Sequence, residues 1–157
     1  MSTILRAIEF LSLSIWLGSD VFFSFVVAPG AFSVLASRDQ AGAIVGYSLT
    51  RMHCMGIVCG VVILMVRVLR IRSLALVAPV ALCVVVMIIL TVISQVAVSP
   101  RMAVLRVQMG SIEATAAGNP LLAEFARLHT ISVGLESGVL LAGMGALFLM
   151  VKESLVR

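Results

Sequence analysis

The chain has 157 residues, of which 62 % are hydrophobic and 11 % are charged, and its mean hydropathy is +1.22. A soluble domain is about 45–50 % apolar and about 25 % charged, so this chain has too few charges to cover a water-exposed surface. The composition excludes a soluble globular enzyme, a disordered tail and a nucleic-acid-binding module. We expect an integral membrane protein that is not an enzyme, that has the lipid bilayer as its partner and that binds no nucleic acid.

Four stretches are apolar enough to cross a bilayer, which takes about 20 helical residues. The predicted spans are approximately residues 4–28, 49–66, 74–98 and 130–151. Pro29 and Pro100 are expected to end the first and third spans. Because backbone groups in lipid must be hydrogen-bonded internally, the spans are helices. The predicted fold class is an all-α, antiparallel four-helix membrane bundle, with residues 1–157 as one transmembrane domain.

The connections between the spans differ in length. Residues 29–48 are expected to hold two short interfacial helices, over 31–35 and 41–47, and an Arg-rich turn joins spans two and three. In the third connection, Asn119 and Pro120 form an N-cap and N1 pair. This pair opens an amphipathic helix that runs into the fourth span.

The distribution of basic residues predicts the orientation of the bundle. Six Lys and Arg residues lie on the side of the two termini and the Arg-rich turn, in shorter segments than the five on the other side. Positive charge in short segments favours the cytoplasmic side. We expect cytoplasmic termini, in a bacterial inner membrane.

Ionisable side chains inside the spans indicate a polar layer. At 1.5 Å per residue, antiparallel helices bring five polar residues to similar depths in the outer leaflet. Such groups are costly in lipid and usually face the bundle interior, where they form functional sites. The predicted layer consists of Asp20, His53, Gln95, His129 and Glu136, with Trp16, Arg51, Arg127 and Ser132 as supporting residues.

A purely structural role for this layer is the competing interpretation. Asp20 would pair with Arg51 or His53, and Glu136 with Arg127 or His129. The helix faces also carry two pairs of glycines four residues apart, which allow close helix approach and are possible surfaces for a homo-oligomer. These pairs are Gly56 with Gly60 and Gly134 with Gly138.

Two cofactor hypotheses remain open at this stage. Cys54, Cys59, Cys83 and Met87 are weak candidates for binding a soft metal. His53 and His129 lie at similar depths on separate helices, as a haem b site requires.

The order of short motifs resembles that of a known family. These motifs are Trp16-x-Gly18, Phe22-Phe23, Ala28-Pro29-x-x-Phe32, Ala41-Gly42, Arg51-x-His53-x-x-Gly56, Ser99-Pro100-Arg101, Leu105-Arg106 and Phe125-x-x-Leu128-His129-x-x-Ser132. Together they cover nearly the whole chain and resemble the transmembrane protein 205-like family, small four-helix membrane proteins with a domain of unknown function. The resemblance implies a four-helix membrane protein and supplies no activity. Glu136 departs from the family pattern, which has an amide near this position.

Three functions follow from these features. The first is binding or transport of a small solute or cation, with Asp20 or Glu136 as a proton-coupled acid because lipid disfavours a charged carboxylate. The second is a haem-b redox protein that uses His53 and His129. The third is a structural or assembly partner in the membrane.

Overall fold

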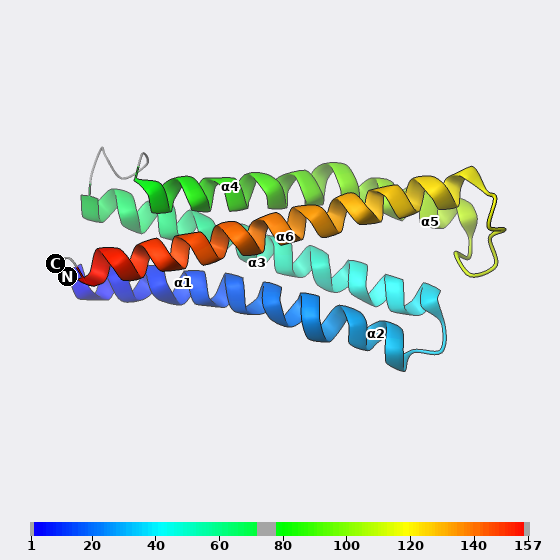
Figure 1. The fold of residues 1–157 in the computed structure, drawn as a ribbon, viewed down its shortest axis with the longest axis horizontal. Coiled ribbons are helices and arrows are strands. Elements are labelled where there is room, and N and C mark those ends of the chain that lie inside the picture. Colours follow the sequence, from blue (N-terminus) through cyan, green and yellow to red (C-terminus); the bar gives the residue numbers. More distant parts are fainter. Residues whose placement is uncertain (1, 72–77, 156–157) are drawn as a thin grey trace.

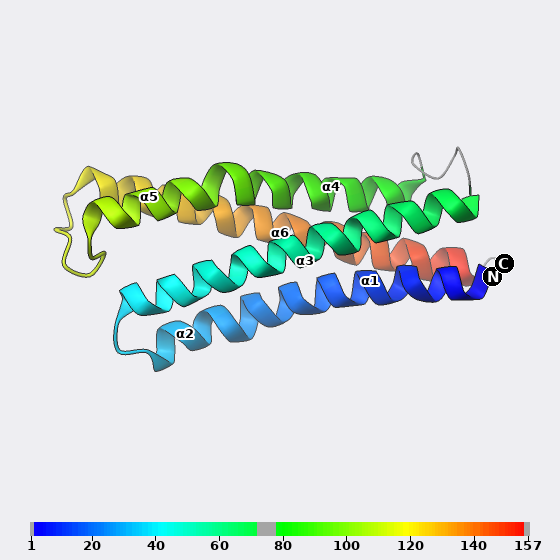
Figure 2. The same ribbon diagram turned by 180° about the vertical axis from the view of Figure 1, so that it is seen from behind.

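The computed structural model describes residues 2–71 and 78–155, and these form a long helical bundle (Figures 1 and 2). In chain order the elements are α1 (Ser2–Phe22), η1 (Phe23–Val27), α2 (Ala28–Val34), α3 (Arg38–Ile71), α4 (Pro79–Ile93), η3 (Ser94–Val98), α5 (Ser99–Met109) and α6 (Pro120–Leu155). No strand occurs in these two ranges. Four continuous helical stretches among the described residues are long and apolar enough to cross a membrane. The protein is therefore an all-α, multi-pass membrane bundle.

The helices run antiparallel, and both termini lie at one end of the bundle, which we call the terminal end (Figure 1). The opposite end carries α2, the start of α3, α5 and the 110–119 connection, and we call it the loop end. The helical stretches of 31–36 residues span about 46–54 Å. A hydrocarbon core is about 30 Å thick, so the helix ends extend into the interfacial layers.

The helices are longer than the sequence predicts, chiefly because neither proline ends a span. Pro29 lies in the first turn of α2 and Pro100 in the first turn of α5, and the helices continue to Val34 and Met109. A proline inside a helix cannot donate to the carbonyl four residues earlier, and its ring crowds that carbonyl. Here a wider π-helical segment precedes each proline and accommodates this break.

The connections are correspondingly shorter than predicted. The expected interfacial helices over 31–35 and 41–47 belong largely to α2 and to the start of α3, so residues 35–37 alone join them. Asn119 caps α6 as predicted, because its Oδ1 accepts a hydrogen bond of 2.9 Å from the Leu121 amide. The start of the expected third span and part of the Arg-rich turn, residues 72–77, lie outside the described residues.

Trp16 fills the centre of the core and explains the first glycine pair. Its side chain is buried against α3, where a Cβ added at Gly56 would overlap the indole ring. A Cβ added at Gly60 would stand 2.7 Å from Trp16 Cζ3. This glycine pair therefore permits close packing of helices within one chain. Gly134, in contrast, is exposed, and a Cβ added there would meet nothing within 4 Å.

Replacing Gly56 with alanine should lower the free energy of unfolding by about 1–3 kcal/mol, because the added methyl group forces Trp16 out of its packed position. Thermal unfolding followed by the fluorescence of the single tryptophan measures this loss. Gly134→Ala is the matched control, since alanine favours a helix and meets open space there. Equal stability of the two variants would contradict this packing.

Candidate functional site

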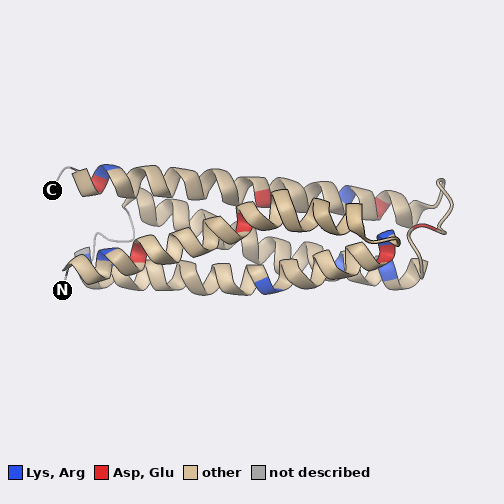
Figure 3. Cartoon of the chain, turned by 90° about the horizontal axis from the view of Figure 1, so that it is seen from below, with Lys and Arg blue, Asp and Glu red and all other residues tan. Residues whose placement is uncertain are grey.

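A group of buried and half-buried polar side chains lies where four helical stretches meet, and we call it the polar cluster. It consists of Asp20, His53, Ser94, Gln95 and Glu136. Figure 3 shows acidic positions midway along the bundle, far from the charges at its two ends. Four of the five residues predicted for the polar layer are therefore close together. His129 is the exception, and Ser94 joins the cluster.

His53 on α3 links two other helical stretches through its ring nitrogens. It is buried, and its Nδ1 lies 2.9 Å from Gln95 Oε1 while its Nε2 lies 2.6 Å from Glu136 Oε1. Because an amide oxygen only accepts, Nδ1 donates to Gln95. The contact between Nε2 and Glu136 is a hydrogen bond that requires one proton on either the imidazole or the carboxyl group. The pair is either imidazolium with carboxylate or imidazole with carboxylic acid, and a proton moves between them without rearrangement of the helices.

Asp20 differs from the other members because no hydrogen-bond donor of the described residues faces its carboxylate. It is 0 % exposed, and neither Oδ1 nor Oδ2 has a hydrogen-bond partner among the described residues. The Glu136 carboxyl group lies close enough to form a hydrogen bond with it when one of the two is protonated, and His53 lies within electrostatic reach. The expected ion pair with Arg51 does not form, because Arg51 is exposed and its guanidinium stacks 5.2 Å above the Tyr47 ring. Burial of an unpartnered carboxyl group costs stability, which points away from a purely structural role.

Two π-helical segments border the polar cluster, and sequence reasoning missed both. Asp20 lies three residues before η1, while Ser94 and Gln95 are the first two residues of η3. In each segment an amide bonds to the carbonyl five residues earlier, from Ala28 to Phe23 and from Ser99 to Ser94. Segments of this kind are rare among protein helices as a whole, but they occur frequently at functional sites, because they change the direction of neighbouring side chains.

A cavity of about 960 Å³ opens in the loop-end half of the bundle and reaches the polar cluster. Its walls come from η1, α2, the first half of α3, α5 and the first half of α6. Glu136 is the cluster carboxylate that lines it, together with Ser132. Apolar and aromatic side chains form most of the remaining wall: Phe23, Phe25, Phe32, Tyr47, Phe125, Val133 and Leu140. The volume is typical of a site for a small organic molecule.

His129 and Arg127 lie outside the polar cluster, although the sequence predicts them in or beside the polar layer. His129 is exposed and lines the cavity, seven residues and about 10 Å along α6 from Glu136. Arg127 is exposed as well. Glu136 therefore pairs with His53 rather than with either of these residues. His129 and Glu136 lie on the same face of α6, and it is the distance of about 10 Å between them along the helix that keeps His129 out of the polar cluster.

The residues proposed for cofactors are not gathered into one site. Among the described residues, no group of three or more His, Cys, Asp and Glu side chains could hold a metal ion. Cys54 is exposed, Cys59 is buried and Cys83 is half-buried, while Met87 packs in the hydrophobic core. Both ring nitrogens of His53 already have partners, so haem ligation would require one of these hydrogen bonds to break.

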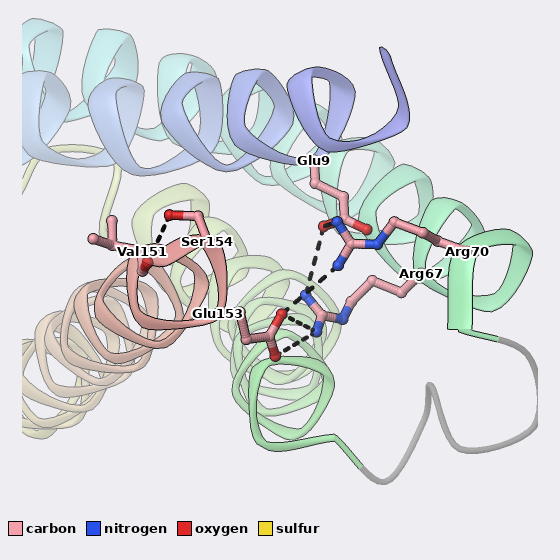
Figure 4. A network of polar contacts seen from close by, with 6 residues as sticks. All are labelled: Glu9, Arg67, Arg70, Val151, Glu153 and Ser154. Carbon is pink, nitrogen blue, oxygen red and sulfur yellow. Dashed lines mark hydrogen bonds and ion pairs between the residues drawn. The ribbon is translucent and has the colours of Figure 1, made fainter. Parts of the chain in front are cut away.

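A second charged group lies at the terminal end, and we call it the terminal charge cluster (Figure 4). Arg67 is 0 % exposed, and its Nη2 lies 2.8 Å from both carboxylate oxygens of Glu153. Glu9 Oε2 lies 3.6 Å from Arg67 Nη1 and 3.2 Å from Arg70 Nη1. The cluster therefore joins α1, α3 and α6. Sequence reasoning missed it by assigning the arginines to the flank of a span.

The sequence was compared with known families and proteins. A family model described as "Domain of unknown function (DUF4149)" matches residues 11–111, which is more than half of the chain. The match includes Asp20, His53 and Gln95 and ends before Glu136. Neither a curated protein nor a solved structure matches the chain. The more specific likeness to the transmembrane protein 205-like family stays an expectation.

Proposed function

The chain belongs to the DUF4149 family, and we propose that it binds a small solute in the cavity and carries it across the membrane together with a proton. One observation carries this proposal. Glu136 lines the cavity, and its Oε1 lies 2.6 Å from Nε2 of buried His53, so a solute in the cavity meets a carboxyl group that can exchange a proton with an imidazole.

The surroundings of Asp20 support the proton-coupled part of the proposal. Three titratable groups share one low-dielectric space, and no described lysine or arginine makes an ion pair with Asp20 or Glu136. Two carboxylates so placed do not readily carry full charge together. A proton retained between the Asp20 and Glu136 carboxyl groups compensates the negative charge of a solute.

Packing along the bundle supports a one-sided entrance. The cavity occupies the loop-end half, whereas Leu13, Ile63, Val139 and Met150 pack between the polar cluster and the terminal end. Arg67 and Glu9 lie beyond this packed layer. We propose that this state admits solute from the loop end. With the expected cytoplasmic termini, this is the outer side of the membrane.

Glu136→Gln should abolish protein-dependent proton entry into vesicles, because the amide keeps the shape of the side chain but cannot release a proton. The purified protein is reconstituted into phosphatidylcholine and phosphatidylglycerol vesicles that contain pyranine, and an inward proton gradient is imposed by lowering the external pH. Fluorescence of the trapped dye reports the internal pH.

Glu124→Gln is the matched control on the same helix, since Glu124 pairs with exposed Arg101 and lies outside the cavity. This variant should conduct as the wild type does. Equal proton entry with both variants, or none above empty vesicles for the wild type, would contradict the proposed function.

A further inference from the structure

We infer that the cavity takes an anionic phospholipid, with the head group against Arg106 and Arg38 and an acyl chain extending toward Glu136. This inference rests on the proposed function, because it names the class of solute that the same cavity binds. It follows from the charge on the cavity wall, the position of Arg106, the depth of the basic residues and the apolar path below them.

The charge on the cavity wall favours an anion. The wall carries the guanidinium groups of Arg38 and Arg106, whereas its one carboxylate, Glu136, is already paired with His53. Neither guanidinium makes an ion pair with any carboxylate of the described residues. Asp39 is near Arg106, but its two oxygens accept hydrogen bonds from Ser111 Oγ and the Ile112 amide. Glu113 Oε1 accepts a hydrogen bond of 2.7 Å from the Arg38 backbone amide, so a second carboxylate lies nearby without forming an ion pair with either guanidinium. The mouth of the cavity therefore carries two guanidinium groups that are free to bind an anion.

Arg106 is held in place without being neutralised. Its Nη1 donates to the Gly42 carbonyl at 2.9 Å, and its guanidinium carbon lies 5.7 Å from the centre of the Phe125 ring. A Cβ at Gly42 would stand 3.0 Å from Arg106 Nη2, so the glycine makes room for this side chain. Arg106 Nε is buried and has no partner among the described residues. A positioned guanidinium that forms no ion pair is suited to phosphate.

The two arginines lie at the depth of lipid head groups. Arg106 is three residues from the end of α5, and Arg38 is the first residue of α3. Both helical stretches exceed the hydrocarbon thickness by about 15 Å or more, so these ends lie in the interfacial layer. Basic pockets between membrane helices commonly bind anionic head groups at this level.

The path from Arg106 to the polar cluster fits an acyl chain. Phe125 stands beside Arg106, and Glu136 follows eleven residues later on α6, about 16 Å along the helix. The wall between them is mainly apolar and aromatic. A free phosphate ion would satisfy the arginines but would leave this wall in contact with water. An anionic lipid matches both the arginines and the apolar wall. Its negative charge is compensated by the positive charge of a cotransported proton.

Native mass spectrometry of the detergent-purified protein tests the inference, with phosphatidylglycerol and phosphatidylcholine of the same chain length in competition. The wild type should retain phosphatidylglycerol preferentially. Arg106→Gln should weaken this preference about fivefold, as expected for one basic residue at a membrane surface. Arg106→Lys keeps the charge and should keep most of the preference.

Arg127→Gln is the control for total charge, because Arg127 is exposed at the same end and does not line the cavity. It should leave the preference unchanged, and added inorganic phosphate should not displace the lipid. Equal retention of the two lipids by the wild type, equal losses in Arg106→Gln and Arg127→Gln, or complete displacement by phosphate would overturn the inference.

The proton measurement separates the two proposals. Proton entry that depends on Glu136, combined with no lipid preference, refutes the lipid and leaves the proposed function standing. A lipid preference that depends on Arg106, without any proton entry, refutes the proposed function and leaves the lipid site standing.

Discussion

Replacing Arg67 with methionine should lower the free energy of unfolding by about 3–5 kcal/mol, the largest loss that we expect from a single substitution. Arg67 is fully buried, and it contacts Glu9 on α1 and Glu153 on α6. Its removal leaves the buried Glu9 carboxylate with Arg70 as its remaining partner. Removing one member of a buried charge network is costly because the other charges stay in a low-dielectric site.

Unfolding of the purified protein in a mixed micelle, with increasing denaturing detergent, measures this loss. Lys152→Met is the matched control, since Lys152 is exposed and adjacent in sequence to Glu153. It should change the stability by less than about 0.5 kcal/mol, as is usual for a surface substitution. A loss in Arg67→Met no greater than that of the control would show that the terminal charge cluster does not stabilise the bundle.

Asp20→Asn should raise the free energy of unfolding by about 1–2 kcal/mol and at the same time abolish proton entry. Asp20 is fully buried, and its oxygens have no partner in the described parts of the chain. The protein must bury this charge or hold the group protonated, whereas asparagine is neutral and its amide can donate a hydrogen bond to Glu136. A residue that serves function can lower the free energy of unfolding, and its replacement then makes the protein more stable.

This substitution separates the functional role of Asp20 from the structural one. If Asp20 stabilised the bundle by pairing, the asparagine variant would unfold more easily than the wild type. The same detergent-unfolding assay decides between the two, with Ser19→Ala as the neighbouring control. Ser19 bonds only to carbonyls within its own helix, at Ile15 and Trp16. A destabilised Asp20→Asn variant with normal proton entry would contradict the functional role.

Much of the architecture could be predicted from the sequence, because lipid permits few alternatives. A chain with so few charges must place its apolar residues in membrane helices, and these must be long enough to cross. The helix ends could not be predicted in the same way. Pro29 and Pro100 are incompatible with an ideal α-helix, but the π-helical segments η1 and η3 precede them and allow the helix to continue. Whether a proline ends a helix or follows a π-helical segment depends on packing with the neighbouring helices.

The candidate site was partly predictable for a similar reason. Depth along an antiparallel helix follows from the rise per residue, so Asp20, His53, Gln95 and Glu136 could be assigned to one level. The prediction of depth is too coarse for His129, which lines the cavity about 10 Å along α6 from Glu136 and lies outside the polar cluster. The cavity depends on the divergence of helices at the loop end, and no short motif encodes this divergence.

The terminal charge cluster shows the limit of assigning charges by position. Arg67 and Arg70 follow an apolar stretch and resemble residues that flank a span, yet Arg67 is fully buried. Glu9 lies within the first predicted span, on the same helix as Asp20. Its pairing with an arginine from α3 required the relative position of the two helices.

The central claim is that the polar cluster holds an exchangeable proton at the floor of the cavity. Infrared difference spectroscopy of the protein in lipid nanodiscs, recorded while the pH is stepped, tests this claim most directly. We predict a carbonyl band from a buried protonated carboxyl group that changes with pH, and that is lost or displaced in Asp20→Asn and in Glu136→Gln but not in Glu124→Gln. A wild-type spectrum without such a band, or a band that both cluster variants retain unchanged, would contradict the account.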